Sequence, residues 1–227
     1  MEKSVFKYKV EPQYVDFTDR VSVSSICDLM LQAAGRDAYG RGFGIDALAD
    51  NNFGWVLSRI AVEMDYMPSQ YSEFTLHTWI SDYNRLSSTR NFTLTDNEGR
   101  EFGRAVSQWC MLNMETRQAV DMTQLKDIYE RAMVAEPSPI TAPARLRDIE
   151  PQASVSRPVV YSDIDFNRHV NTLRYVDMIF DTLPLDVIEK SEALRMDINF
   201  LAEARYGEII SIGSVCDGGK WQFEISS

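Results

Sequence analysis

Three side chains suited to hydrolysis occur at alternate positions within residues 165–169. They are the carboxylate of Asp165, the carboxamide of Asn167 and the imidazole of His169, and Val170 and Asn171 follow directly. In an extended segment, side chains two residues apart point to the same side, so we expect these three to converge on one substrate. His169 is one of only two histidines in the chain. The run therefore predicts a hydrolytic site immediately before a helix.

A proline-rich segment divides the chain into two halves that must position this site. Five of the eight prolines fall within residues 136–158, a density that blocks regular structure and predicts a linker over residues 135–157. The domains on either side are residues 1–134 and 158–227. Each is predicted to open with a strand and a helix and to continue with long strands, the second half having about one strand fewer. This order favours an α+β fold in which a curved antiparallel sheet wraps a helix in each half.

Each predicted helix has a polar cap and an apolar stripe. The first is capped by Ser24 or Ser25, with a stripe formed by Ile26, Leu29, Met30 and Ala33. The second is capped by Asn171 and ends before Pro184, with a stripe formed by Leu173, Val176, Ile179, Phe180 and Leu183. Alternating apolar residues predict strands at 55–66, 74–81, 90–95 and 102–112 in the first half, and at 194–201, 208–216 and 221–225 in the second.

The two halves also share short sequence matches. Asp16-Phe17 and Val21 align with Asp165-Phe166 and Val170. Farther on, Tyr71-x-Glu73 resembles Tyr206-x-Glu208. The alignment predicts that the first half is a copy in which Arg20 stands at the position of His169. One half is then expected to keep the chemistry while the other shapes a substrate cavity.

Charge and cysteine content narrow the class of protein. The net charge of −11 argues against a general surface for nucleic acid or anionic membranes. The three cysteines, Cys27, Cys110 and Cys216, are too scattered for a disulfide framework and fit a reducing compartment. The first residues carry no recognisable signal or transit peptide. We therefore expect a cytoplasmic protein that binds neither nucleic acid nor membrane.

The run from Asp165 to Asn171, with Tyr175 four residues on, resembles the signature of the acyl-acyl carrier protein thioesterases of plant plastids and bacteria. Segments 79–81, 107–111 and 116–117 resemble strand motifs of the same family, so the resemblance covers most of the chain outside the linker. It implies a double hotdog fold, with two tandem hotdog domains and most of the acyl-chain cavity in the first. In the family a glutamate follows the histidine at a fixed interval and completes the site, and Glu203 stands at that position.

The resemblance also implies a partner and excludes one mechanism. Many plant members carry a cysteine directly after the glutamate, whereas this chain has Ala204, so a cysteine nucleophile is not expected here. The implied partner is an acyl carrier protein with a phosphopantetheine-linked acyl chain, and no cofactor or metal is implied. Arg168 and Arg174 are expected to meet the phosphate or the acidic carrier. A monomer or a homodimer is expected, because two fused hotdogs can pair within one chain.

Thioester hydrolysis suits these residue types. A thiol leaving group has a pKa of about 8.5 and departs without a strong general acid. His169 or Glu203 could take a proton from water, and Asn167 could hold the carbonyl or the water. The helix that begins near Asn171 offers backbone N–H groups to the developing oxyanion. Asp165 could orient these groups, or it could attack the thioester itself. Between direct attack by Asp165 and the activation of water, we favour the activation of water.

Two other functions compete with this interpretation. One is hydrolysis of acyl-coenzyme A esters, and the other is an acyl-thioester-binding sensor without turnover. A hotdog dehydratase is least expected, because the Asp-x-Asn-x-His pattern with a later glutamate resembles the thioesterase branch. The length and branching of the acyl chain are not specified by the sequence.

Overall fold

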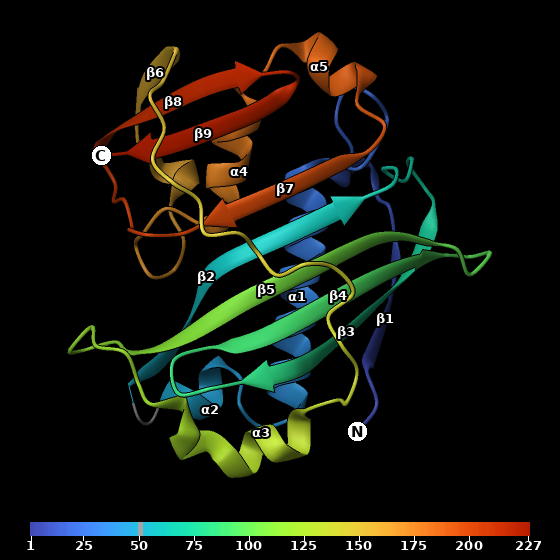
Figure 1. The fold of residues 1–227 in the computed structure, drawn as a ribbon, viewed down its shortest axis with the longest axis vertical. Coiled ribbons are helices and arrows are strands. Elements are labelled where there is room, and N and C mark those ends of the chain that lie inside the picture. Colours follow the sequence, from blue (N-terminus) through green and yellow to red (C-terminus); the bar gives the residue numbers. More distant parts are fainter. Residues whose placement is uncertain (50–51) are drawn as a thin grey trace. The chain divides into compact units, whose positions relative to one another are not determined.

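The computed structural model describes residues 1–49 and 52–227, which divide into two compact units. The first unit comprises Met1–Ala144 and Glu192–Phe200, and the second comprises Arg145–Ser191 and Leu201–Ser227. Each unit contains helices and an antiparallel sheet, so the predicted α+β class is confirmed (Figure 1). Among the described residues, no helix has the length and apolar character needed to cross a membrane.

The sheet of the first unit has the strand order β1-β3-β4-β5-β2-β7, with antiparallel neighbours throughout. The strands are β1 (Ser4–Lys9), β2 (Phe53–Met64), β3 (Glu73–Tyr83), β4 (Ser88–Asp96), β5 (Glu101–Asn113) and β7 (Leu194–Asn199). All four strands predicted for the first half after its helix are present. The predicted second-half strand at residues 194–201 is present as β7, but it pairs with β2. Apolar alternation predicts that a strand exists and says nothing about which strand lies beside it.

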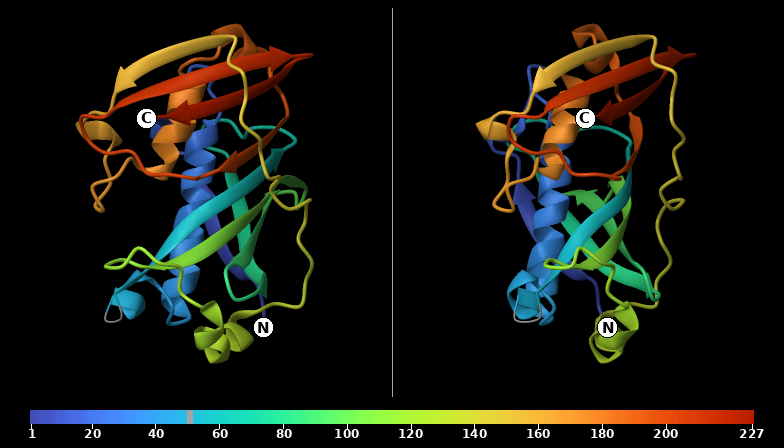
Figure 2. Two further views of the ribbon diagram at one scale, coloured as in Figure 1. Left: turned by 60° about the vertical axis from the view of Figure 1, so that its left-hand side comes forward. Right: turned by 90° about the vertical axis from the view of Figure 1, so that its left-hand side faces the viewer.

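Helix α1 (Val23–Gly40) lies along one face of this sheet (Figure 2). Its predicted stripe is confirmed, since Ile26, Leu29, Met30 and Ala33 are all buried. The predicted cap at Ser24 or Ser25 is wrong, because the N-cap is Ser22. Ser22 has extended backbone angles, and its hydroxyl oxygen accepts the N–H of Ser25 at 3.2 Å. The shorter elements of the unit are the 3-10 turns η1 (Pro12–Tyr14) and η2 (Met122–Leu125) and the helices α2 (Ile45–Ala49) and α3 (Lys126–Ala132).

Residues 134–144, which we call the strap, cross the opposite face of the same sheet (Figure 2). At one end Val134 N–H donates to the Ile80 carbonyl at 2.9 Å, and at the other Ala144 N–H donates to Asp197 Oδ1 at 3.1 Å. The strap therefore runs from β3 to β7. This agrees with a proline-rich linker lying over the surface. The predicted linker nevertheless extends too far, because its last residues form β6 (Ala153–Pro158). Pro151 precedes β6 and Pro158 ends it, so neither interrupts the middle of the strand.

A buried charged cluster ties α1 to the sheet. Asp37 on α1 and Arg90 on β4 are each 4% exposed, and Arg90 Nη1 lies 2.7 Å from Asp37 Oδ2. The other oxygen of Asp37 accepts Arg41 Nε at 2.6 Å and the Ser4 hydroxyl at 2.5 Å. Burial alone would raise the pKa of the Asp37 carboxyl, but the Arg90 charge and these hydrogen bonds outweigh it and lower that pKa. Asp37 is therefore ionised at neutral pH and fully paired.

The second unit has a three-stranded antiparallel sheet in the order β6-β8-β9 and the helices α4 and α5. Its remaining elements are η3 (Tyr161–Asp163), α4 (Thr172–Phe180), α5 (Leu185–Lys190), β8 (Ile209–Asp217) and β9 (Lys220–Ser226). Asn171 is the predicted N-cap of α4, and its side chain accepts Leu173 N–H at 2.9 Å. The helix ends earlier than predicted, at Phe180, so Leu183 lies outside it. Pro184 caps the start of α5 and does not terminate α4.

Candidate functional site

Residues 165–169 form a tight turn, so the predicted extended segment is wrong. Asp165 N–H donates to the His169 carbonyl at 2.9 Å, and Arg168 N–H donates to the Asp165 carbonyl at 3.0 Å. Asp165 Oδ1 accepts the backbone N–H groups of Asn167 (2.8 Å) and His169 (3.3 Å). Arg168 adopts φ 66° to close the turn. Asp and Asn favour such side chain-to-backbone hydrogen bonds, and here they override the alternation of an extended strand.

The same turn occurs in the first unit at residues 16–20. Asp16 N–H donates to the Arg20 carbonyl at 2.9 Å, and Asp19 N–H donates to the Asp16 carbonyl at 3.1 Å. Asp16 Oδ1 accepts Thr18 N–H at 2.8 Å, and Asp19 has φ 58°. The predicted repeat is thus confirmed at the level of individual backbone hydrogen bonds. Arg20 occupies the position of His169, as the sequence alignment predicts.

In both units, the residue that follows the turn forms a backbone hydrogen bond with a distant segment of the chain. Val170 N–H donates to the Ala204 carbonyl at 2.8 Å, and Val21 N–H donates to the Pro68 carbonyl at 2.9 Å. Pro68 is therefore the counterpart of Ala204, and Met67 is the counterpart of Glu203. We call the turn and the segment bonded to it the frame: residues 16–21 with 67–68 in the first unit, and residues 165–170 with 203–204 in the second. The second frame has His169 and Glu203 where the first has Arg20 and Met67.

The predicted match of Tyr71-x-Glu73 with Tyr206-x-Glu208 is shifted by one residue. Tyr71 N–H donates to the Val10 carbonyl, and the corresponding donor in the second unit is Gly207 N–H, which bonds to the Val159 carbonyl. Tyr71 and Gly207 also share a positive φ, 64° and 85°. The repeated Tyr-x-Glu residues therefore do not occupy equivalent positions. The shared backbone conformation shows that Tyr71 and Gly207 are equivalent.

His169 and Glu203 come together in the second unit. Nδ1 of His169 lies 3.4 Å from Oε2 of Glu203, and their side chains are 15% and 37% exposed. The backbone supports this approach, because His169 and Arg205 are bridge partners in antiparallel orientation. A carboxylate at this distance can orient the imidazole and stabilise its protonated form. The pair can therefore transfer a proton at Nε2, the ring nitrogen that faces away from Glu203.

The other predicted residues surround this pair in different roles. Asn167 and Arg168 are exposed at the tip of the turn, and neither side chain has a hydrogen-bond or ion-pair partner within the described part of the chain. Arg174 is half exposed on α4 and pairs with Asp177 at 2.8 Å. Asn171 uses its side-chain oxygen as the helix cap. Binding of substrate by Asn171, Arg168 and Arg174 stays a prediction.

The predicted oxyanion donors at the start of α4 are partly in use. Leu173 N–H bonds to the Asn171 side chain, and Arg174 N–H bonds to the Asn171 carbonyl at 2.9 Å. The backbone N–H of Thr172, the first residue of the helix, has no hydrogen-bond partner among the residues that the structure describes. Its N–H is the first-turn donor available to a substrate oxygen.

Tyr175 contacts the site although the sequence marks it only as part of the motif. Its hydroxyl oxygen accepts Ala204 N–H at 3.0 Å, directly beside Glu203. Burial raises the pKa of the Tyr175 hydroxyl, the Ala204 hydrogen bond lowers it, and the negative charge of Glu203 raises it again, with a net increase. Tyr175 therefore keeps its proton at neutral pH. Its spacing of six residues after His169 was visible in the sequence, but its contact with Ala204 was not.

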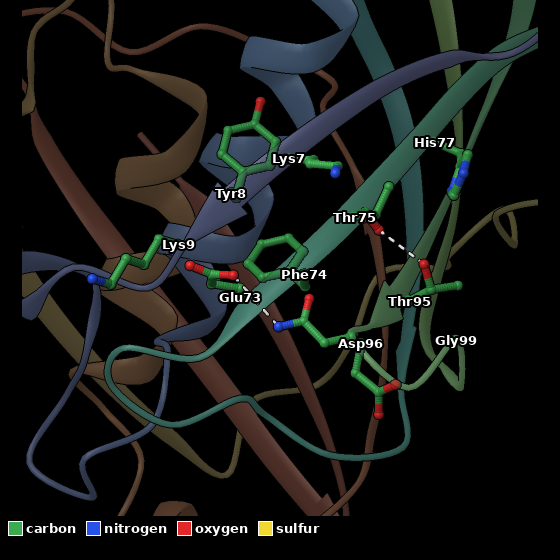
Figure 3. Close-up of a pocket in the computed structure, with 11 residues that line it drawn as sticks. Lys7, Tyr8, Lys9, Glu73, Phe74, Thr75, His77, Thr95, Asp96 and Gly99 are labelled. Carbon is green, nitrogen blue, oxygen red and sulfur yellow. Dashed lines mark hydrogen bonds between the residues drawn. The ribbon is translucent and has the colours of Figure 1, made fainter.

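An open pocket of about 620 Å³ lies on the first unit, and none of the predicted site residues lines it. It is lined by residues of β1, β3 and β4, and Figure 3 shows Lys7, Lys9, Glu73 and His77 around it. Burial and the nearby charge of Lys3 lower the pKa of His77. The charged rim does not suit an alkyl chain, so the acyl cavity expected in the first half stays a prediction. Within residues 1–49 and 52–227, no three His, Cys, Asp or Glu side chains group closely enough to hold a metal ion.

Comparison with known proteins matches both halves of the chain to one family. Residues 2–131 match the model of the acyl-ACP thioesterase N-terminal domain, and residues 147–226 match that of the C-terminal domain. The oleoyl-acyl carrier protein thioesterase 2 of Arabidopsis thaliana chloroplasts is 23% identical over 221 residues, 90% of this chain and 60% of that protein. The chain thus spans about three fifths of that curated relative.

Solved structures share the fold over nearly the whole chain. An acyl-ACP thioesterase from Bacteroides thetaiotaomicron superposes with a TM-score of 0.87 at 34% identity, covering 98% of this chain and 91% of that one. The 12:0-ACP thioesterase from Umbellularia californica superposes with a TM-score of 0.81 at 20% identity, covering 95% and 88%. The predicted double hotdog fold is confirmed by these matches.

Proposed function

Because this chain belongs to the acyl-ACP thioesterase family, we propose that it hydrolyses the thioester of an acyl-acyl carrier protein and releases a free fatty acid during fatty acid biosynthesis. The observation that carries the proposal is the contrast between the two repeated turns. The turn in the second unit places His169 3.4 Å from Glu203. In the first unit, Arg20 and Met67 occupy the equivalent positions. These two side chains cannot transfer a proton in this way.

In the proposed reaction, His169 removes a proton from a water molecule as the water attacks the thioester carbonyl. Glu203 stabilises the imidazolium that forms, and the carboxamide of Asn167 orients the water or the carbonyl. The first-turn N–H of α4 donates to the oxyanion. Collapse of the tetrahedral intermediate breaks the carbon–sulfur bond, and the imidazolium returns the proton to the departing thiolate. Asp165 holds the turn that presents these groups.

The substitution Asp165→Asn separates orientation by Asp165 from direct attack. An asparagine oxygen can still accept the two N–H groups that hold the turn, but an amide cannot serve as a nucleophile. With water as the nucleophile, we expect the kcat of this variant to fall at least tenfold less than that of His169→Ala. Steady-state thiol release measures both. Loss of activity equal to that of His169→Ala would instead support attack by Asp165.

A panel of acyl esters tests the proposed function itself. Acyl carrier protein esters of several chain lengths are compared with matched coenzyme A esters, and free thiol is measured. We expect turnover with kcat/KM at least tenfold higher for the carrier esters. A preference for coenzyme A esters would make the protein an acyl-CoA thioesterase, and tight binding of all esters without turnover would make it a sensor.

Two arginines provide a matched comparison within that panel. We propose that exposed Arg168 contacts the phosphate or an acidic side chain of the carrier protein, whereas Arg174 already pairs with Asp177. Arg168→Ala should therefore raise KM for carrier esters about fivefold, the scale of one charge-assisted contact. Arg174→Ala should change it by less than twofold, and equal effects would contradict the assignment.

We further propose two domains joined by a linker, with the acyl chain held by the first, but the second domain begins no later than β6 (Ala153–Pro158), so the linker is shorter than the predicted residues 135–157. The match of the N-terminal family model to residues 2–131 supports the limit of the first domain, and the match of the C-terminal model to residues 147–226 supports the earlier start of the second. We place the protein in the cytoplasm as a monomer or homodimer, on the basis of its scattered cysteines and its fused repeat. Size-exclusion chromatography with light scattering tests the oligomeric state.

A further inference from the structure

Two further differences separate the repeated frames, and they occur together. The fourth residue of α4 is Tyr175, and the fourth residue of α1 is Ile26. The residue after Glu203 is Ala204, and its counterpart is Pro68, which has no N–H. The second unit therefore has a hydroxyl and an amide where the first has an aliphatic side chain and a proline. The unit that carries the histidine and the carboxylate is the one with this extra hydrogen bond.

Two hydrogen bonds fix the backbone of Ala204, one at its N–H and one at its carbonyl. Ala204 is 5% exposed, its N–H donates to the Tyr175 hydroxyl at 3.0 Å, and its carbonyl accepts Val170 N–H at 2.8 Å. Glu203 precedes this fixed residue, and the Glu203 side chain is more exposed than that of His169. An exposed glutamate has many accessible rotamers, so a fixed backbone is needed to keep its carboxylate opposite the imidazole.

We propose that Tyr175 is a positioning residue that fixes the backbone at Ala204 and thereby holds Glu203 against His169. The inference rests on the proposed function for its effect on turnover. The packing alone does not require a tyrosine, because the first unit fills the equivalent position with Ile26, which is fully buried. Nor does the chain path require an N–H, because Pro68 follows the same path.

The first test uses the two halves of the hydrogen bond separately. Tyr175→Phe removes the acceptor, and Ala204→Pro removes the donor with the residue that the first unit already has there. Each is expected to lower kcat about tenfold with KM changed less than twofold, and the double variant should be no worse than either single one. Tyr206→Phe is the matched control, because Tyr206 is 70% exposed and should behave as wild type. Additive losses, or a full-rate Tyr175→Phe variant, would overturn the inference.

A second measurement does not depend on turnover. The chain has two histidines, so His77→Gln leaves one imidazole whose ring ¹⁵N signals can be followed by NMR at a fixed pH. In that background, Tyr175→Phe should change the ring ¹⁵N chemical shifts of His169 in the same direction as Glu203→Gln, because both weaken the contact between Nδ1 and the carboxylate, and it should add nothing once Glu203 is replaced. Chemical shifts that change with Glu203→Gln but not with Tyr175→Phe would refute the positioning role. Absence of turnover in the wild type would instead refute the proposed function, and the chemical shifts would still decide the role of Tyr175.

Discussion

Replacing His169 with alanine is expected to lower kcat for acyl-carrier esters by roughly 10³-fold, within the range that a positioned proton-transfer group contributes. KM should change less than threefold, because in the proposed reaction the imidazole acts on the water and does not bind the acyl chain. His77→Ala is the matched control, since His77 lies on β3 in the first unit. Residual activity above a tenth of wild type would show that another group removes the proton.

Glu203→Gln is expected to lower kcat about 30-fold, less than the loss of the imidazole itself. Glutamine keeps the shape of the side chain but cannot stabilise a positive charge on His169. Because Glu203 acts through His169 in the proposed reaction, the double variant should be no slower than His169→Ala alone. Stopped-flow or steady-state thiol release measures the set. A double variant slower by the product of the two effects would indicate that Glu203 acts on the substrate independently.

Asp37→Asn is expected to reduce the free energy of unfolding by about 3 kcal/mol, the scale for removing one partner of a buried ion pair. The reason is that Arg90 would then be buried without its counter-charge. For a protein of this size the midpoint of thermal unfolding should fall by about 10 °C. Asp46→Asn is the control, because Asp46 is exposed on α2. Calorimetry or urea unfolding measures both variants, and equal stability of the two would contradict the role of the cluster.

The same pair predicts how stability depends on pH. The pKa of Asp37 in the folded state lies below its ordinary value of 3.8, so its contribution is fully present above that pH. It is lost as the pH falls through the folded-state pKa, because the native carboxylate is then protonated. The stability difference between wild type and Asp37→Asn should therefore shrink below pH 3.8. A difference that stays constant to pH 2 would show that the ionised carboxylate is not its source.

Local patterns in the sequence predicted most of the elements. The stripe of α1 and the alternating strands depend on burial with a fixed period, which a sequence displays directly. The alternation of residues 165–169 predicts an extended segment, but the hydrogen bonds of the turn come from the Asp165 side chain and have no periodic signature. The sequence does not identify Ser22 as the cap, because three serines lie close together and only backbone geometry distinguishes them.

The candidate site was predictable as residues but not as contacts. Asp165, Asn167 and His169 belong to one short run, whereas Glu203 depends on the resemblance for its place. The Tyr175–Ala204 hydrogen bond joins residues that are 29 positions apart in the sequence, so no local sequence pattern predicts it. The pairing of β7 with β2 is of the same kind, because a strand sequence does not encode the identity of its neighbour.

The pairing of β7 with β2 has a consequence for synthesis on the ribosome. Met64 lies opposite Leu194 in this register, so the two strands emerge about 130 residues apart, which is several seconds or more at common elongation rates. Until then one edge of the first sheet is β2, whose row of unpaired N–H and C=O groups can pair with another nascent chain. A chain released after residue 144 would keep that edge permanently. The second half of the sequence thus covers the exposed edge of the first sheet as well as supplying His169.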